Sequence, residues 1–156
     1  MKRILLAIIL GLGACSPTSS TYDDPMLARM RRDSDAYQFE FGAITQRITN
    51  SSQAFRSANG CERRHLLEVL GAIDELERLP SRAGGLSSYN RGLNAAAVRE
   101  MPSELNRMAT AAADRRCYDL ARTIYLKVIE LFPEAWAAAP RQRAQIGIDD
   151  LRAQRR

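Results

Sequence analysis

The chain has 156 residues, a formal net charge of +5 and a single histidine. This length is sufficient for one domain with a substantial hydrophobic core. A lone histidine excludes the common metal sites that use two or more histidines, so we interpret His65 as an ordinary surface residue.

The N-terminal segment has the pattern of a secretory signal peptide. Lys2 and Arg3 precede an apolar run at residues 4–12, and small residues then lead to Cys15. A helix over this run and the two small residues after it would be about 16 Å long, whereas the hydrocarbon core of a bilayer is about 30 Å thick. The segment is therefore too short to span a membrane, and we predict that residues 1–14 are removed.

The end of this segment, Leu12-Gly13-Ala14-Cys15, resembles the lipobox of bacterial lipoproteins. The resemblance implies that the Cys15 thiol carries a diacylglyceryl group, that a peptidase cuts just before this residue, and that the new amine is usually acylated, with palmitate as the expected chain. An ordinary signal peptide with a chance cysteine is the alternative. Ser16 stands where an aspartate marks inner-membrane retention in enterobacterial lipoproteins, so the resemblance implies the outer membrane, on its periplasmic side.

A lipid anchor would leave the polar residues 15–24 as a tether and residues 25–156 as a single domain. Two or three acyl chains bind a protein to a membrane almost permanently, and the tether reaches at most about 30 Å. The domain would therefore work near the membrane surface, outside the cytoplasm, which argues against nucleic acid as a partner. Nearly all of its cations are arginines. A GC-rich genome explains that excess more simply than contacts with lipid phosphates or wall carboxylates.

Two cysteines, Cys61 and Cys117, remain once Cys15 is lipidated. An even number of cysteines in an oxidising compartment predicts that they form a disulfide. The bond would close a long loop and stabilise the fold by about 4 kcal/mol at most. Two buried free thiols are the alternative.

A first helix of about 30 residues is predicted from residue 25, because Asp24 is a suitable cap and Pro25 a suitable first helical residue. Asn59-Gly60 is a suitable end. Apolar residues and two serines form a stripe with a period of about 3.5 residues, at Met30, Ser34, Tyr37, Phe41, Ile44, Ile48, Ser51 and Phe55. The stripe could pair with a second copy as a coiled coil, but we favour packing against the next helix as an antiparallel hairpin over residues 25–80.

That second helix is predicted from Glu62 to about Leu79, because Pro80 lacks the amide hydrogen that a helix needs. Its apolar face consists of Leu66, Leu67, Leu70, Ile73, Leu76 and Leu79. Glycine, serine and arginine dominate residues 81–92, which we predict to be the main internal loop and a place for a contact surface. A short helix at 93–100 completes the region 81–101.

Residues from Pro102 to Pro133 resemble one tetratricopeptide repeat, a helical hairpin that packs on neighbouring copies. The matching positions are Leu105, Met108, Ala109, Ala112, Tyr118, Ala121, Tyr125 and Pro133, although the repeat usually has glycine in place of Ala109 and tyrosine in place of Ala112. Such a repeat normally needs three or more copies, so we expect a repeat-like fold and not an array.

The last segment is expected to be a second such unit or a capping helix, with Trp136, Ile146 and Leu151 in the core and Pro140 starting or kinking the helix. The sequence thus predicts an all-α domain of five to six helices, built from antiparallel hairpins, with tetratricopeptide-like packing at residues 102–156.

No catalytic motif is recognisable in the sequence. Asp149 and Asp150 are neighbours on a predicted helix, so their side chains point about 100° apart and cannot chelate one ion together. We therefore expect no enzyme, no metal and no cofactor. A wall-modifying glycosidase is the least favoured function, because no aromatic-rich cleft is evident for a sugar.

The favoured function is an adaptor or scaffold that positions a protein partner of an envelope assembly. In tetratricopeptide proteins the inner helices line a groove that binds extended peptides or partner helices. The cations near that position are Arg107, Arg115, Arg122 and Lys127, which would receive acidic groups of the partner; a solvated helix face explains them too. The alternative is a structural lipoprotein that self-associates or contacts peptidoglycan.

Overall fold

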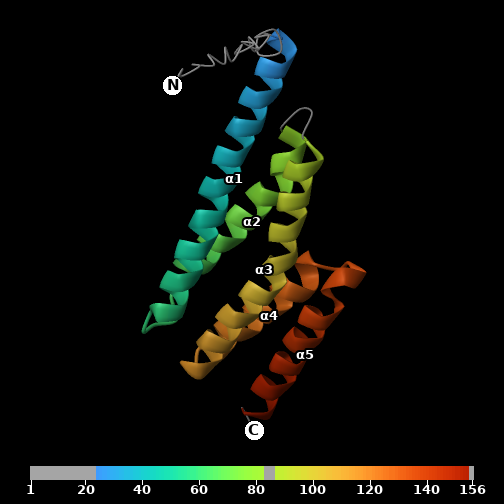
Figure 1. Ribbon diagram of the computed structural model, residues 1–156. Coiled ribbons are helices and arrows are strands. Elements are labelled where there is room, and N and C mark those ends of the chain that lie inside the picture. Colours follow the sequence, from blue (N-terminus) through green and yellow to red (C-terminus); the bar gives the residue numbers. More distant parts are fainter. Residues whose placement is uncertain (1–23, 83–86, 155–156) are drawn as a thin grey trace, which may run out of the picture.

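The computed structural model describes residues 24–82 and 87–154, and in these ranges the chain is helical, without strands. The helices are α1 (Pro25–Ser57), α2 (Arg64–Arg82), α3 (Ser88–Asp114), α4 (Tyr118–Leu131), the short 3-10 helix η2 (Ala135–Ala137) and α5 (Ala138–Ala153). Successive α-helices run in opposite directions (Figure 1). The predicted all-α fold of five to six helices is confirmed.

α1 begins at the predicted residue, and its apolar face packs against other helices of the same chain. The carboxylate of Asp24 accepts a hydrogen bond from the amide of Met26 at 2.8 Å, and Pro25 is the first helical residue. The buried face lies against α2 and α3 and consists of Tyr37, Ile44, Ile48, Ser51, Ser52 and Phe55. This stripe is therefore not free to form a coiled coil with a second copy. It is also not buried along its whole length, since Met30 is 56% exposed.

α2 continues past Pro80 to Arg82, so its predicted end at Leu79 is wrong. A proline inside a helix leaves the carbonyl four residues earlier without its amide donor. Here that carbonyl belongs to Leu76, and the side-chain amide of Asn94 in α3 donates a hydrogen bond to it at 2.8 Å. The buried asparagine thus replaces the missing backbone bond and ties α2 to α3.

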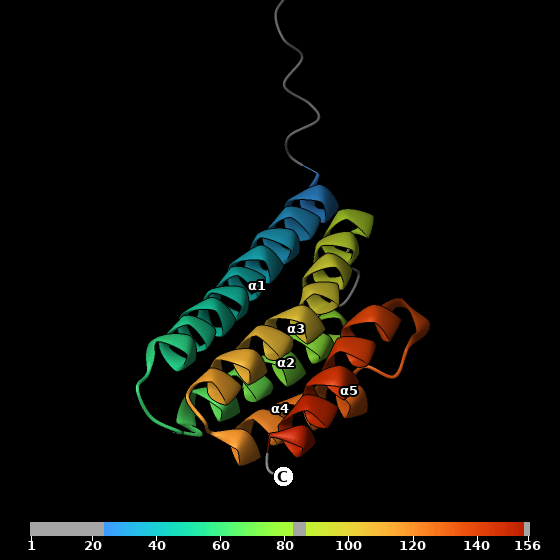
Figure 2. The same ribbon diagram turned by 90° about the horizontal axis from the view of Figure 1, so that it is seen from below.

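α3 runs for 27 residues from Ser88, through positions predicted as loop and as two separate helices. The hydroxyl of Ser87 caps its start by accepting a hydrogen bond from the amide of Asn90 at 3.1 Å. Pro102 lies inside the helix, and α3 changes direction near its middle (Figures 1 and 2), as a proline kink requires. The predicted loop at 81–92 is therefore too long at both ends, and its residues 83–86 lie outside the described part of the chain.

α3 is the central helix, because it contacts the other four α-helices. Near its middle the carboxylate of Glu104, only 13% exposed, accepts hydrogen bonds from Ser52 of α1 and from Arg107, and forms an ion pair with Arg56 of α1. Burial raises the pKa of Glu104, but the hydrogen bonds from Ser52 and Arg107 and the positive charges of Arg107 and Arg56 together hold it below its usual value. This ion network ties α1 to α3.

The connection between α3 and α4 is a tight turn closed by two backbone hydrogen bonds. The amide of Arg116 donates to the carbonyl of Ala113 at 2.8 Å, and the amide of Cys117 donates to the carbonyl of Ala112 at 2.9 Å. This pair of bonds is the Schellman motif, which needs a left-handed residue after the helix. Arg116 takes that conformation with φ of 62°.

Most residues matched to the tetratricopeptide pattern lie in α3 and α4, which pack against each other, whereas Pro133 follows α4 and is exposed. Fully buried positions of this set are Leu105, Met108, Ala109, Ala112 and Ala121. α5 covers α3 and α4 as the expected last helix. Of the three core residues predicted for this segment, Leu151 is buried, whereas Trp136 is 39% and Ile146 53% exposed. The predicted core positions of Trp136 and Ile146 are therefore wrong.

Candidate functional site

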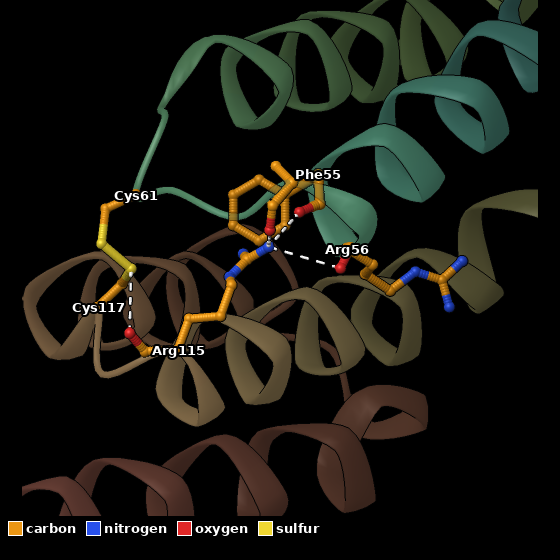
Figure 3. Close-up of a disulfide and its surroundings, with 6 residues drawn as sticks. Phe55, Arg56, Cys61, Arg115 and Cys117 are labelled. Atoms are coloured by element: carbon orange, nitrogen blue, oxygen red, sulfur yellow. Dashed lines mark hydrogen bonds between the residues drawn. A yellow bond between two sulfur atoms is a disulfide. The ribbon is translucent and has the colours of Figure 1, made fainter.

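Arg115 and the disulfide connect the end of α1 and the loop after it to the turn between α3 and α4 (Figure 3). Cys61, in the loop after α1, is bonded to Cys117, in the turn before α4, with a Cα–Cα distance of 5.6 Å. The predicted pairing is thus confirmed. Beside it, the guanidinium of Arg115 lies 5.0 Å from the centre of the Phe55 ring and donates hydrogen bonds to the carbonyl oxygens of Phe55, at 2.7 Å, and Ala58.

These carbonyl groups belong to the C-terminal end of α1, where a helix leaves acceptors without internal donors. The Arg115 guanidinium donates hydrogen bonds to these carbonyl groups, so its main contacts are intramolecular and structural. We assign it this role in place of the predicted contact with a partner.

The other three predicted partner-binding residues do not converge on one surface. Arg107 and Lys127 form ion pairs within their own helices, with Glu104 and with Glu130 at 2.7 Å. Arg122 lines a small cleft of about 110 Å³ between α4 and α5. Arg122 and Lys127 are five residues apart on one helix, so they point about 140° apart. The predicted basic binding surface therefore does not form a single site.

The remaining candidate residues make local contacts. Nδ1 of His65 lies 3.2 Å from Oε2 of Glu68 on the same helix. Asp149 pairs with Arg152 at 3.0 Å. Among the described side chains, no three of the histidine, cysteine, aspartate or glutamate type are placed to hold a metal ion. Cys15 lies outside the described residues, and none of the helices within them is long and apolar enough to cross a membrane.

One hollow of the described surface is an open groove of about 420 Å³ beside the N-terminal half of α3. Its lining residues come from α2, α3, the end of α4 and η2, and are Glu77, Asn94, Ala95, Val98, Arg99, Leu131, Glu134 and Trp136. The groove exists because α3 is about 40 Å long and α4 only about 21 Å. α4 ends at Leu131, so α3 extends beyond it on this side.

Apolar side chains form one part of the groove. Trp136 is 39% and Leu131 37% exposed, and both contribute apolar surface beside Val98 and Ala95. The indole of Trp136 packs edge-on against the buried ring of Phe132, with 6.1 Å between ring centres. That contact stabilises this orientation of the indole, and the groove presents an aromatic surface to solvent.

Two carboxylates form the other part of the groove lining. Glu77 comes from α2 and Glu134 immediately precedes η2. Within the described chain neither carboxylate has a hydrogen bond or an ion pair, although Arg99 lines the same groove. Partial burial raises the pKa of Glu77, and the negative charges of Asp74 and Glu134 raise it further. With two carboxylates and one guanidinium, the groove has an excess of negative charge, on a protein that is positively charged overall.

Sequence reasoning missed this groove, since its residues are widely separated in the chain. Trp136 was expected in the core, and Glu77 and Glu134 carry no motif. The one available signal was Pro133, which correctly predicted that α4 would stop and leave the following residues to turn away.

No protein-family model, curated protein or solved structure matches the chain. The contacts and surfaces described above, together with the sequence patterns, are therefore what supports a function.

Proposed function

We propose that the protein is a lipid-anchored adaptor that holds a protein partner at the periplasmic side of the outer membrane, with the groove beside α3 as the binding site. The anchor is supported by the lipobox-like sequence Leu12-Gly13-Ala14-Cys15. The disulfide between Cys61 and Cys117 agrees with an oxidising compartment.

The observation that carries the proposal is the exposed indole of Trp136 in an open groove. Tryptophan is enriched among the residues that contribute most to protein–protein binding. Here the indole lies beside the apolar residues Leu131 and Val98, with charged residues around them. An apolar centre with a charged rim is the usual composition of a protein-binding surface.

Photocrosslinking in intact cells tests the proposal. A photoreactive amino acid replaces Ala95, an exposed residue of α3 that lines the groove, or Ala43, an exposed residue of α1 that serves as the control. We expect a discrete crosslinked protein from position 95 and none from position 43. Equal products from both positions, or none from position 95, would contradict the binding site.

The anchor is tested separately. Cys15→Ala should release the protein from the membrane fraction, because the proposed acyl chains would no longer be attached. Sedimentation of this variant with membranes as complete as that of the unchanged protein would contradict the lipid anchor and leave the groove proposal in place.

Self-association is a second candidate, supported by the exposed apolar end of α1. Met26 and Met30 are 70% and 56% exposed and continue the stripe that α1 buries further along. A second copy packed on this end would cover them. If a concentration-dependent dimer exists in sedimentation equilibrium and disappears with Met30→Asp, this function is favoured over the adaptor.

A further inference from the structure

We propose that the groove binds a basic segment of the partner protein, in which a lysine or arginine stands next to an apolar residue. This inference rests on the proposed adaptor function and specifies the chemistry of what the groove binds. It reverses the expectation from the sequence, which predicted an acidic partner held by arginines.

The charges of the groove indicate that the ligand is basic. The lining contains two carboxylates, Glu77 and Glu134, and one guanidinium, that of Arg99, so it has an excess of negative charge. Neither carboxylate is engaged within the described part of the molecule, whereas Glu104 and Glu130, on nearby elements, are each bound by a cation. Asp74, which also raises the pKa of Glu77, is itself paired with Arg78 at 2.8 Å. The two groove carboxylates thus lack the bound cation that Glu104, Glu130 and Asp74 have.

A cation brought into the groove would remove the repulsion between Glu77 and Glu134. A hydrogen bond from a lysine or arginine side chain to a carboxylate is roughly twice as strong as one between neutral groups. The face of an indole also attracts ammonium and guanidinium groups, an interaction that is strongest for tryptophan. Trp136 lines the same groove with its ring partly open to solvent, so it offers a second attraction to the same group.

The apolar residues of the groove indicate that the ligand also has an apolar side chain next to its basic residue. Leu131, Val98 and Ala95 present aliphatic surface beside the carboxylates. A simple cation such as a metal ion would leave this surface exposed to water, whereas a peptide with an apolar side chain next to its basic residue would cover it. The groove also has the volume that small-molecule and peptide side chains need, at about 420 Å³.

Trp136 allows a direct test, because it is the only tryptophan of the chain and its fluorescence therefore reports on the groove alone. The full-length protein in a non-ionic detergent is titrated with two peptides of equal length. One peptide alternates leucine with lysine, and the other alternates leucine with glutamate. We expect a saturable change in fluorescence with the lysine peptide and none with the glutamate peptide.

A pair of matched variants separates specific binding from general charge attraction and from partition into detergent. Glu77→Gln with Glu134→Gln removes two negative charges from the groove. Glu62→Gln with Asp150→Asn removes two from exposed positions that do not line it. We expect the groove variant to bind the lysine peptide at least about tenfold more weakly and the control variant to bind it unchanged.

The outcomes distinguish this inference from the function on which it rests. Equal binding of both peptides, equal weakening by both variants, or no saturable signal with the lysine peptide would overturn the basic ligand. If the crosslink from position 95 persists undiminished in the groove variant, the adaptor function stands and the inference about charge is wrong. If no crosslink forms at position 95, the adaptor function itself fails.

Discussion

Gly147 lies on α5 where that helix meets α4, and its replacement by alanine tests the packing of these two helices. A Cβ atom at this position would lie 2.5 Å from Cε2 and 2.8 Å from Oη of Tyr125. Carbon atoms in contact are normally about 3.5–4.0 Å apart, so the ring would have to move by about 1 Å. Tyr125 is only 7% exposed and its hydroxyl lies 3.2 Å from that of Thr110, so its movement is restricted.

The expected free-energy change combines two opposing effects. Alanine in place of glycine inside a helix stabilises by about 0.5–1 kcal/mol, whereas forcing extra atoms into a packed contact costs about 1–3 kcal/mol. Gly147→Ala should therefore lower the free energy of unfolding by up to about 2 kcal/mol. Gly71→Ala is the matched control, because Gly71 is also helical and has no atoms within 4 Å of the added Cβ position. It should raise the free energy of unfolding by about 0.5–1 kcal/mol.

Urea denaturation followed by circular dichroism measures both variants, and a double-mutant cycle identifies the cause. In a Tyr125→Leu background the ring is absent, so Gly147→Ala should become as favourable as Gly71→Ala. If Gly147→Ala stabilises the unchanged protein as much as Gly71→Ala does, α4 and α5 do not approach each other at this position and the packing described here is wrong.

Three further predictions concern stability. Reduction of the bond between Cys61 and Cys117, 56 residues apart, should lower the free energy of unfolding by about 4 kcal/mol at most; an unchanged urea midpoint under reducing conditions would show that the bond does not constrain the chain. Arg116→Gly should stabilise by about 1 kcal/mol, because glycine has no penalty at φ of 62°, and a lower thermal midpoint would contradict this. Glu77→Gln should raise the free energy of unfolding at neutral pH. Burial and the negative charges of Asp74 and Glu134 raise the pKa of Glu77 in the folded protein. The contribution of protonated Glu77 to stability is therefore fully present below the ordinary glutamate pKa of about 4.3 and is lost as the pH rises through the raised value. Urea midpoints measured against pH should therefore separate the variant from the unchanged protein above this range and bring them together below it.

Local sequence signals predicted the helices that depend on local interactions. The cap at Asp24 and the apolar stripe gave α1 within a residue or two, since both lie within the segment that they describe. The expected lipidation of Cys15 left two cysteines, so the sequence predicted a single pairing, which the structure has.

Tertiary contacts explain why the prolines misled the prediction. Pro80 does not end α2, because Asn94 from another helix supplies the hydrogen bond that the proline cannot donate. Pro102 bends α3 without ending it, since both halves of that helix are held by packing against their neighbours. Such compensation comes from residues that are distant in sequence, so it leaves no local signal.

The candidate site was unpredictable for a related reason. Glu77, Val98 and Trp136 meet only because α3 extends beyond the end of α4. Trp136 and Ile146 are apolar and were assigned to the core, whereas their exposure depends on where neighbouring helices stop. Arg115 resembled a free surface cation in sequence, yet the end of α1 lies within reach of its guanidinium.

The central claim, that the groove holds a protein partner, is tested most directly by the photocrosslink from position 95 in cells that also carry Trp136→Ala. We expect the crosslinked product to fall sharply, because the exposed indole contributes much of the binding surface, while the helical circular dichroism of the purified variant stays unchanged. A crosslinked product of undiminished yield would show that Trp136 is not part of the contact and would contradict the assignment of this groove as the binding site.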